Sequence, residues 1–223
     1  MFIYQRPSKS IFIPKETTYL LPRNHITDTL QNGLFEEPLI EWTKQFCYKD
    51  KIMIDIGAHT GTYSLSLAPF VREVQAFEPQ RLTYYGLCGG VALSNFSNIH
   101  CHSLGLGSIE QVGSQTLNIV SEDGGGSTLL DHQFVKRRET IIVQTLDSFQ
   151  FQNICLIKID VEGNEANVIK GALQTLQRND YPYIIFEAND DSTLKSVKDI
   201  LIEHTPYQIH PIRGVYNMFL ASK

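Results

Sequence analysis

The sequence predicts an α/β fold of the doubly wound kind, in which helices cover both faces of a mostly parallel sheet. Short apolar segments typical of buried strands alternate with segments of helical periodicity. Of the 223 residues, 42% are hydrophobic and 19% are charged, which provides enough apolar surface for one large core. The net charge of −5 disfavours a dedicated nucleic-acid-binding protein, because such proteins usually carry a basic excess.

The period of the apolar residues locates each element. Strands are expected at 51–56, 73–78, 98–104, 153–160 and 181–187, with further β-like runs at 115–120, 140–146, 207–212 and 215–221. Helices are expected at 38–48, 63–67, 81–93 and 193–203, with one continuous helix after Gly163. Residues 1–34 contain prolines and are poorly periodic, so we expect an N-terminal arm over the surface, followed by a single domain at 35–223.

Apolar runs and cysteine spacing indicate the cellular compartment. Charges interrupt every apolar stretch before about 18 residues, so no segment is expected to span a membrane. The first residues lack the apolar core of a signal peptide, and the four cysteines show no C-x-x-C spacing. We therefore expect a cytoplasmic protein with reduced thiols.

A glycine-bounded turn follows the strand at 51–56. Asp55 precedes the turn, Gly57 and Gly61 flank it, and Glu78 closes the next strand. Such a turn lets a ligand approach the backbone, and a carboxylate at the position of Glu78 can bind both hydroxyls of a ribose. His59 stands where a dinucleotide-binding turn needs a glycine beside the pyrophosphate. The pattern favours a cationic, phosphate-free cofactor such as S-adenosylmethionine over NAD; a tight turn without a ligand is the alternative.

Charged residues interrupt the strand at 153–160, where a central parallel strand should be almost wholly apolar. Lys158, Asp160 and Glu162 alternate on one face of this segment. Buried charges are costly unless they are paired, so Lys158 is expected to form an ion pair. Asp160 and Glu162 stand at the carboxyl end, where ligands bind in such sheets, and are candidates for chemistry. A purely structural ion-pair network is the alternative.

The run TLDSFQFQNICLIKIDVEGNEANVIKGALQTLQ, followed by PYIIFE, resembles the FkbM-type family of S-adenosylmethionine-dependent methyltransferases. IDIGAHTGTYSL and AFEP are similar to the cofactor motifs of that family, and all the motifs occur in its order over residues 35–190. The resemblance implies a class I methyltransferase fold, with a seven-stranded Rossmann-like sheet whose last strand is antiparallel. It also implies methyl transfer to a hydroxyl, often of a sugar, glycan or polyketide.

The resemblance further implies roles for individual residues. By position, Asp55, Gly57 and Gly61 line the methionine part of the cofactor, and Glu78 holds its ribose. Ser103 stands where the family often has an asparagine near the adenine, so it is the candidate for that contact.

Methyl transfer to a hydroxyl needs a base that accepts the proton during attack. Glu162 is the predicted base, and Asp160 orients it or stabilises the sulfonium charge of the cofactor. Glu187 is the second candidate for the base; alternatively, it caps the helix that follows it. Asp160, Glu187 and Asn189 could together hold one Mg²⁺ ion through oxygen ligands, although a metal is not part of the prediction.

Two further segments bear on the acceptor. The loop Ser121–Leu130 either covers the acceptor, with hydroxyls from Ser127 and Thr128, or is an exposed hairpin tip. The basic run at 136–138 is expected to be a solvated edge. We expect a small-molecule or glycan acceptor and no nucleic acid. An NAD-linked oxidoreductase or epimerase and a non-catalytic binding module are the alternative functions.

Overall fold

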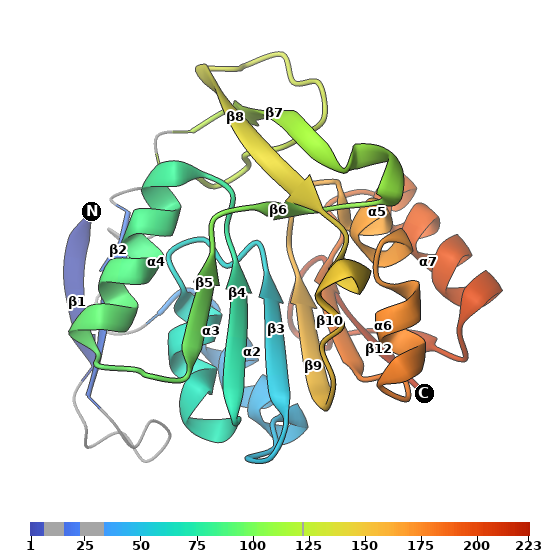
Figure 1. The fold of residues 1–223 in the computed structure, drawn as a ribbon, viewed down its shortest axis with the longest axis horizontal. Coiled ribbons are helices and arrows are strands. Elements are labelled where there is room, and N and C mark those ends of the chain that lie inside the picture. The colour runs from blue at the N-terminus through green and yellow to red at the C-terminus, as the bar shows by residue number, and fades with distance from the viewer. Residues whose placement is uncertain (7–15, 23–33, 122) are drawn as a thin grey trace.

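The computed structural model describes residues 1–6, 16–22, 34–121 and 123–223. Its centre is a seven-stranded sheet with the order β11-β12-β10-β9-β3-β4-β5 (Figure 1). The strands are β3 (Ile52–Ile56), β4 (Glu73–Phe77), β5 (Ile99–His102), β9 (Ile154–Ile159), β10 (Tyr183–Glu187), β11 (Gln208–Pro211) and β12 (Met218–Ser222). β12 pairs antiparallel with both of its neighbours, whereas β3, β4, β5, β9 and β10 are mutually parallel. The predicted mostly parallel sheet of seven strands with an antiparallel last strand is confirmed.

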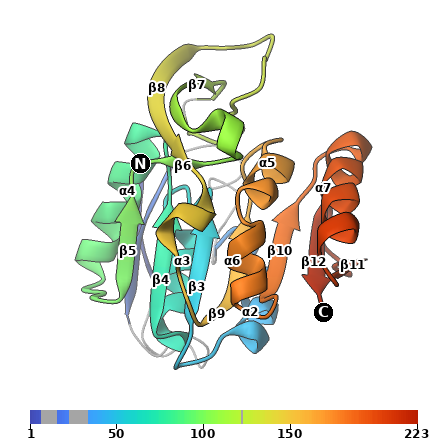
Figure 2. The same cartoon turned by 45° about the vertical axis from the view of Figure 1, so that its right-hand side comes forward.

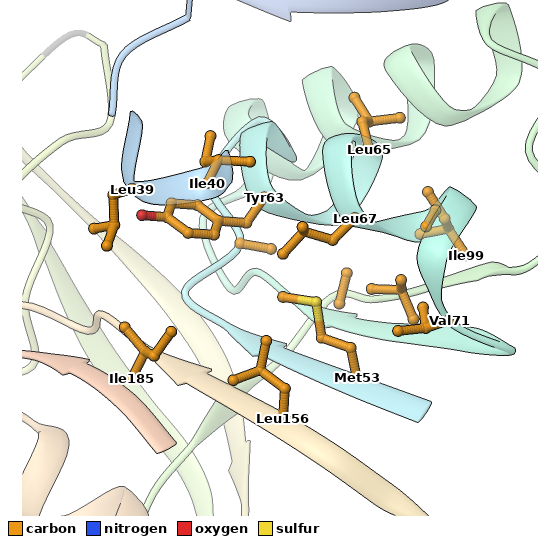
Figure 3. Close-up of a cluster of buried hydrophobic side chains, with 14 of the residues drawn as sticks. Leu39, Ile40, Met53, Tyr63, Leu65, Leu67, Val71, Ile99, Leu156 and Ile185 are labelled. Carbon is orange, nitrogen blue, oxygen red and sulfur yellow. The ribbon is translucent and has the colours of Figure 1, made fainter. Parts of the chain in front are cut away.

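Helices pack on both faces of this sheet. One face is covered by α2 (Glu37–Thr43), α3 (Thr62–Leu67) and α4 (Arg81–Leu93), and the other by α5 (Glu165–Lys170), α6 (Leu173–Arg178) and α7 (Asp191–His204). Side chains alternate along a strand, so Met53 faces the first group while Ile54 faces the second. Figure 3 shows Met53, Leu156 and Ile185 packed beneath side chains of α2 and α3. Short 3₁₀ helices at Lys44–Phe46, Ala68–Phe70, Ile109–Gln111 and Leu146–Phe149 complete the connections.

The prediction of one continuous helix after Gly163 is wrong, because the structure has two shorter helices there, α5 and α6. The break lies at Gly171, where a Cβ atom would stand 2.0 Å from the carbonyl oxygen of Gly107. Gly171 is the C-cap residue of α5, and its backbone packs against that of Gly107. The buried stripe from Val168 to Leu176 is nevertheless retained across the break.

A second, three-stranded sheet lies beyond the carboxyl ends of the central strands (Figures 1 and 2). It consists of β6 (Gly105–Leu106), β7 (Gly113–Ile119) and β8 (Arg137–Gln144), in the order β6-β8-β7. The predicted β-like runs at 115–120 and 140–146 therefore pair with each other rather than extend the central sheet. This placement carries the connecting glycine-rich loop to the edge where ligands bind.

The described part of the predicted N-terminal arm forms a ribbon of β1 (Phe2–Arg6) and β2 (Thr17–Leu21). β2 is not a surface element, because its side chains are mostly buried against α3 and α4. The hydroxyl groups of Tyr19 and Ser66 are hydrogen-bonded at 2.9 Å. Gly90 lets the backbone of β2 lie close to α4, since a Cβ on Gly90 would stand 3.2 Å from the Thr18 carbonyl oxygen. Residues 7–15 and 23–33 lie outside the described residues, and no described helix is long and apolar enough to cross a membrane.

Candidate active site

A cavity of about 390 Å³ opens at the carboxyl ends of β3, β4, β9 and β10. This volume lies within the range of roughly 300–1,000 Å³ that is usual for small-molecule and cofactor sites. Its walls come from the glycine turn after β3, the end of β4, the segment after β9 and the glycine-rich loop. The cavity therefore stands where open α/β sheets bind ligands.

The turn after β3 brings backbone close to the end of β9. Gly57 has a φ of +75°, and a Cβ on it would stand 1.7 Å from the carbonyl oxygen of Asp160. Only glycine fits this close approach in a left-handed conformation. Two residues later, the amide of His59 donates a hydrogen bond of 2.8 Å to Glu78 Oε2, so the turn wraps around the end of β4.

Glu78 is the best-anchored carboxylate of the cavity. Its other oxygen accepts hydrogen bonds from the amide of Gln80 at 2.8 Å and the hydroxyl of Thr83 at 2.9 Å. Burial raises the pKa of Glu78, while His59 and these hydrogen bonds act in the opposite direction. A carboxylate offers about four acceptor positions, so Glu78 retains capacity for a ribose hydroxyl.

Asp55 does not lie where its predicted role requires. Its side chain is fully buried and does not line the cavity. Ser64 donates a hydrogen bond of 2.6 Å to Asp55 Oδ2, and Lys158 Nζ lies 3.9 Å from Oδ1. Lys158 also donates to Asp160 Oδ2 at 3.0 Å and thus stands between two carboxylates. The expected ion pair of Lys158 is present, and it separates Asp55 from the cavity.

Asp160, Glu162 and Glu187 form an acidic cluster at the ends of β9 and β10. One carboxylate oxygen of each lies within 4.8 Å of the others, and all three side chains line the cavity. Burial, together with the charge of Asp160, raises the pKa of Glu162 to about 7 and that of Glu187 to about 8. Groups that titrate near neutral pH are suited to proton transfer. The three oxygens could also hold a hard divalent cation.

Asn189 does not present its side-chain oxygen to the acidic cluster, as a role in holding Mg²⁺ would require. Its amide nitrogen donates to Glu187 Oε2 at 2.8 Å and to Glu162 Oε2 at 3.4 Å, while its oxygen accepts from Asn217. Asn189 therefore presents a donor to the carboxylates rather than an oxygen ligand. The helix α7 is capped by Asp190, whose Oδ1 accepts from the amide of Thr193 at 2.8 Å, so the alternative role of Glu187 as a cap is excluded.

The glycine-rich loop, Ser121–Leu130, lies against the cavity and contacts both the acidic cluster and the turn after β3. The amide of Gly126 donates to Glu162 Oε1 at 3.1 Å, and the Thr128 hydroxyl donates to the carbonyl oxygen of Glu162 at 2.7 Å. On the other side, Nε2 of His59 lies 2.8 Å from the carbonyl oxygen of Asp123. The loop is thus part of the site and not an exposed hairpin tip.

Comparison with known proteins decides the family. The model of the methyltransferase FkbM domain matches residues 55–207, which is more than half of the chain. The protein belongs to the FkbM methyltransferase family. This is a family of S-adenosylmethionine-dependent methyltransferases. No curated protein matches the sequence.

Solved structures share the fold of this FkbM family member. The FkbM methyltransferase of Methylobacillus flagellatus KT is 22% identical, with a TM-score of 0.55; the alignment covers 77% of this chain and 43% of that one. The precorrin-6y C5,15-methyltransferase of Geobacter metallireducens GS-15 is 12% identical, with a TM-score of 0.54 and coverage of 86% and 91%. A Streptococcus mutans structure in complex with SAH is 12% identical, with a TM-score of 0.53 and coverage of 86% and 97%.

Some residues of this FkbM family member are placed differently from the sequence prediction. Ser103 is exposed and does not line the cavity, whereas Leu104 beside it does. The basic run agrees with the prediction of a solvated edge, because Lys136 and Arg138 are exposed, while Arg137 pairs with Glu139 at 3.2 Å. Glu36 lines the cavity and was missed, since it lies outside every motif.

Proposed function

We propose that this enzyme transfers the methyl group of S-adenosylmethionine to a hydroxyl of a sugar, glycan or other small polyol. The observation that carries the proposal is that Glu78, a carboxylate placed to bind a ribose, shares one cavity with Glu162 and Glu187, whose pKa values are about 7 and 8. Bound S-adenosylmethionine supplies an electrophilic methyl group on a positively charged sulfur. The remaining chemistry belongs to the side chains of the chain.

The lining of the cavity fits this cofactor. In the proposal, Glu78 accepts hydrogen bonds from the ribose hydroxyls, and Gly57 and Gly61 let the backbone turn around the cofactor. The Asp160 carbonyl already fills the space beside Gly57, so a larger residue at position 57 would clash with it and disrupt the turn. Asp160 contributes negative charge for the sulfonium, and Asp55 acts through Lys158 rather than by contact. His59 stands where a pyrophosphate would need a glycine, which disfavours NAD.

Glu162 is the proposed base and Glu187 the alternative. A hydroxyl becomes an adequate nucleophile when a positioned carboxylate accepts its proton, and a base works best with a pKa near the working pH. Glu162 reaches this condition through burial and the neighbouring Asp160. The loop segment at 123–127 lines the cavity beside this base, and the amide of Gly126 donates a hydrogen bond to Glu162 Oε1.

The charges of the lining favour a neutral acceptor. Glu36, Asp160, Glu162 and Glu187 all face the cavity, and the Lys158 ammonium is occupied by Asp160. Among the described residues, the lining offers a phosphate backbone no unpaired lysine or arginine, and its carboxylates repel phosphate wherever they are ionised. We therefore propose that nucleic acid is not the acceptor.

The proposal is tested with cofactor carrying a labelled methyl group. The enzyme is incubated with a library of neutral sugars and glycans, with sugar phosphates and with rRNA. Label is expected in a neutral polyol at an ether linkage, as shown by mass spectrometry after base treatment, which removes methyl esters. Transfer to rRNA alone would contradict the proposed acceptor class. Failure of S-adenosylhomocysteine to bind would contradict the proposed cofactor.

A further inference from the structure

The segments that precede the family-matched residues contribute to the cavity. Leu21, Pro22, Phe35 and Glu36 line it, although all four lie ahead of residue 55. Glu36 is the only charged residue among them. Its side chain is the feature of the site that neither the motifs nor the family match accounts for.

The carboxylate of Glu36 is directed into the site by its local structure. Glu36 has a φ of 58°, a left-handed conformation that is uncommon for residues other than glycine. It is the residue before α2, yet its side chain makes no capping hydrogen bond to that helix. Instead, Oε2 accepts a hydrogen bond of 3.0 Å from the hydroxyl of Tyr63. Within the described part of the chain, Oε1 receives no hydrogen bond, so one oxygen is available to a ligand.

Tyr63 links Glu36 to the charged residues at the base of the cavity. The ring of Tyr63 lies beneath Lys158, whose Nζ is 5.1 Å from the ring centroid. Lys158 is in turn paired with Asp160. Glu36 is therefore close enough to both residues for their charges to affect its pKa, which burial raises overall.

The proposed cofactor carries an ammonium group at its methionine end, and a buried ammonium needs anionic or carbonyl acceptors. The sequence assigned this end to Asp55, but Asp55 lies behind Lys158 and does not reach the cavity. Asp160 already accepts a hydrogen bond from Lys158. Glu36 offers a free carboxylate oxygen in the same cavity.

We propose that Glu36, held by the Tyr63 hydroxyl, binds the ammonium group of the methionine end of S-adenosylmethionine. The inference rests on the proposed function, because it assumes that this cofactor occupies the cavity. It gives the segment before residue 55 a direct part in cofactor binding.

Calorimetry with two ligands tests the assignment. S-adenosylhomocysteine contains the amino-acid end, whereas 5′-methylthioadenosine lacks it and keeps the nucleoside. Glu36→Gln retains an acceptor for Tyr63 but loses the charge. It is expected to bind S-adenosylhomocysteine about 10- to 100-fold more weakly, the range for hydrogen bonds between charged groups, and to bind 5′-methylthioadenosine unchanged. Glu37→Gln makes the same change one residue away, at a side chain that does not line the cavity, and should alter neither affinity.

Three outcomes would contradict the assignment. Equal weakening of both ligands by Glu36→Gln would show a structural role. Unchanged affinity for S-adenosylhomocysteine would show that Glu36 does not contact the methionine end, even if the KM for the acceptor rose. If the wild-type enzyme bound neither ligand, the proposed cofactor itself would fall, and the inference with it.

Discussion

Glu78 and Glu162 are two carboxylates at the same edge of the sheet, and their surroundings give them different chemistry. Two backbone amides and the Thr83 hydroxyl hold Glu78, whose exposure is only 6%. Glu162 receives one backbone hydrogen bond, from Gly126, and lies beside two further carboxylates.

Burial raises the pKa of both groups, but the remaining contributions differ in sign. At Glu78, the nearby His59 and the hydrogen bonds act against burial. At Glu162, the charge of Asp160 adds to burial, and the pKa reaches about 7. The comparison teaches that donors fix a carboxylate for binding, whereas like charges prepare one for proton transfer.

The largest expected effect tests the proton-transfer half of this comparison. Glu162→Gln keeps the shape of the side chain but cannot accept a proton, so turnover should fall by about 10² to 10⁴-fold. The affinity for S-adenosylhomocysteine should stay nearly unchanged, as measured by calorimetry alongside steady-state kinetics.

Glu187→Gln is the matched variant for this test. If it abolished turnover while Glu162→Gln remained active, the base would be Glu187. If both variants kept full activity, a metal or solvent would activate the hydroxyl. Loss of wild-type activity in EDTA and rescue by Mg²⁺ would then show that a metal held without these two carboxylates activates the hydroxyl.

The binding half of the comparison is tested at Glu78. Glu78→Gln should weaken S-adenosylhomocysteine by about 1.5–3 kcal/mol, because the charge that accepts the ribose hydroxyls is lost. Calorimetry measures the loss, and Glu73→Gln at the other end of β4 is the control. An unchanged affinity would show that the ribose binds elsewhere.

The pH dependence sharpens the comparison further. The base must be deprotonated, so kcat should rise about tenfold per pH unit below the pKa of about 7 and then level off. Asp160→Asn removes the charge that raises this pKa, so the profile should move to lower pH. A profile unaffected by that change would contradict the electrostatic role of Asp160.

The free energy of unfolding should fall with rising pH, over the range in which kcat rises. Glu162 and Glu187 have raised pKa values of about 7 and 8 in the folded state, so the native protein binds more protons than the unfolded chain above pH 4.5. The free energy of unfolding therefore declines as pH rises from about 5 to 8 and is level beyond that. Thermal unfolding of the wild type against the double Gln variant measures this contribution, which the double variant should lack.

The smallest effect is expected in the loop that touches both halves of the site. Gly124 has a φ of +89°, and a Cβ there would lie 2.4 Å from Thr83 Cγ2. Gly124→Ala should cost about 1 kcal/mol in loop docking and lower kcat/KM by about fivefold. Gly125→Ala is the control, because its Cβ would meet nothing nearer than 3.7 Å. Equal kinetics for the two variants would show that loop docking does not support catalysis.

The sequence by itself determined the layout of the catalytic domain. Local periodicity located the five parallel strands, and the rule that strand ends meet at one edge brought Glu78, Asp160, Glu162 and Glu187 to one cavity. Gly57 was identified for the same local reason, since its left-handed turn follows directly from a strand and precedes a helix. Each of these positions is predicted from the residues of one strand and the turn that follows it.

Only the tertiary structure decided how distant segments meet. Asp55 and Asp160 look alike in sequence, yet the Lys158 side chain separates one from the cavity and pairs with the other. β2 is buried because glycines of α4 admit its backbone, and Glu36 enters the site because Tyr63 lies within reach. Apart from the pair Lys158–Asp160, the partners in these contacts are tens of residues or more apart. No periodicity signals such contacts, because the chain between the partners fixes neither distance nor direction.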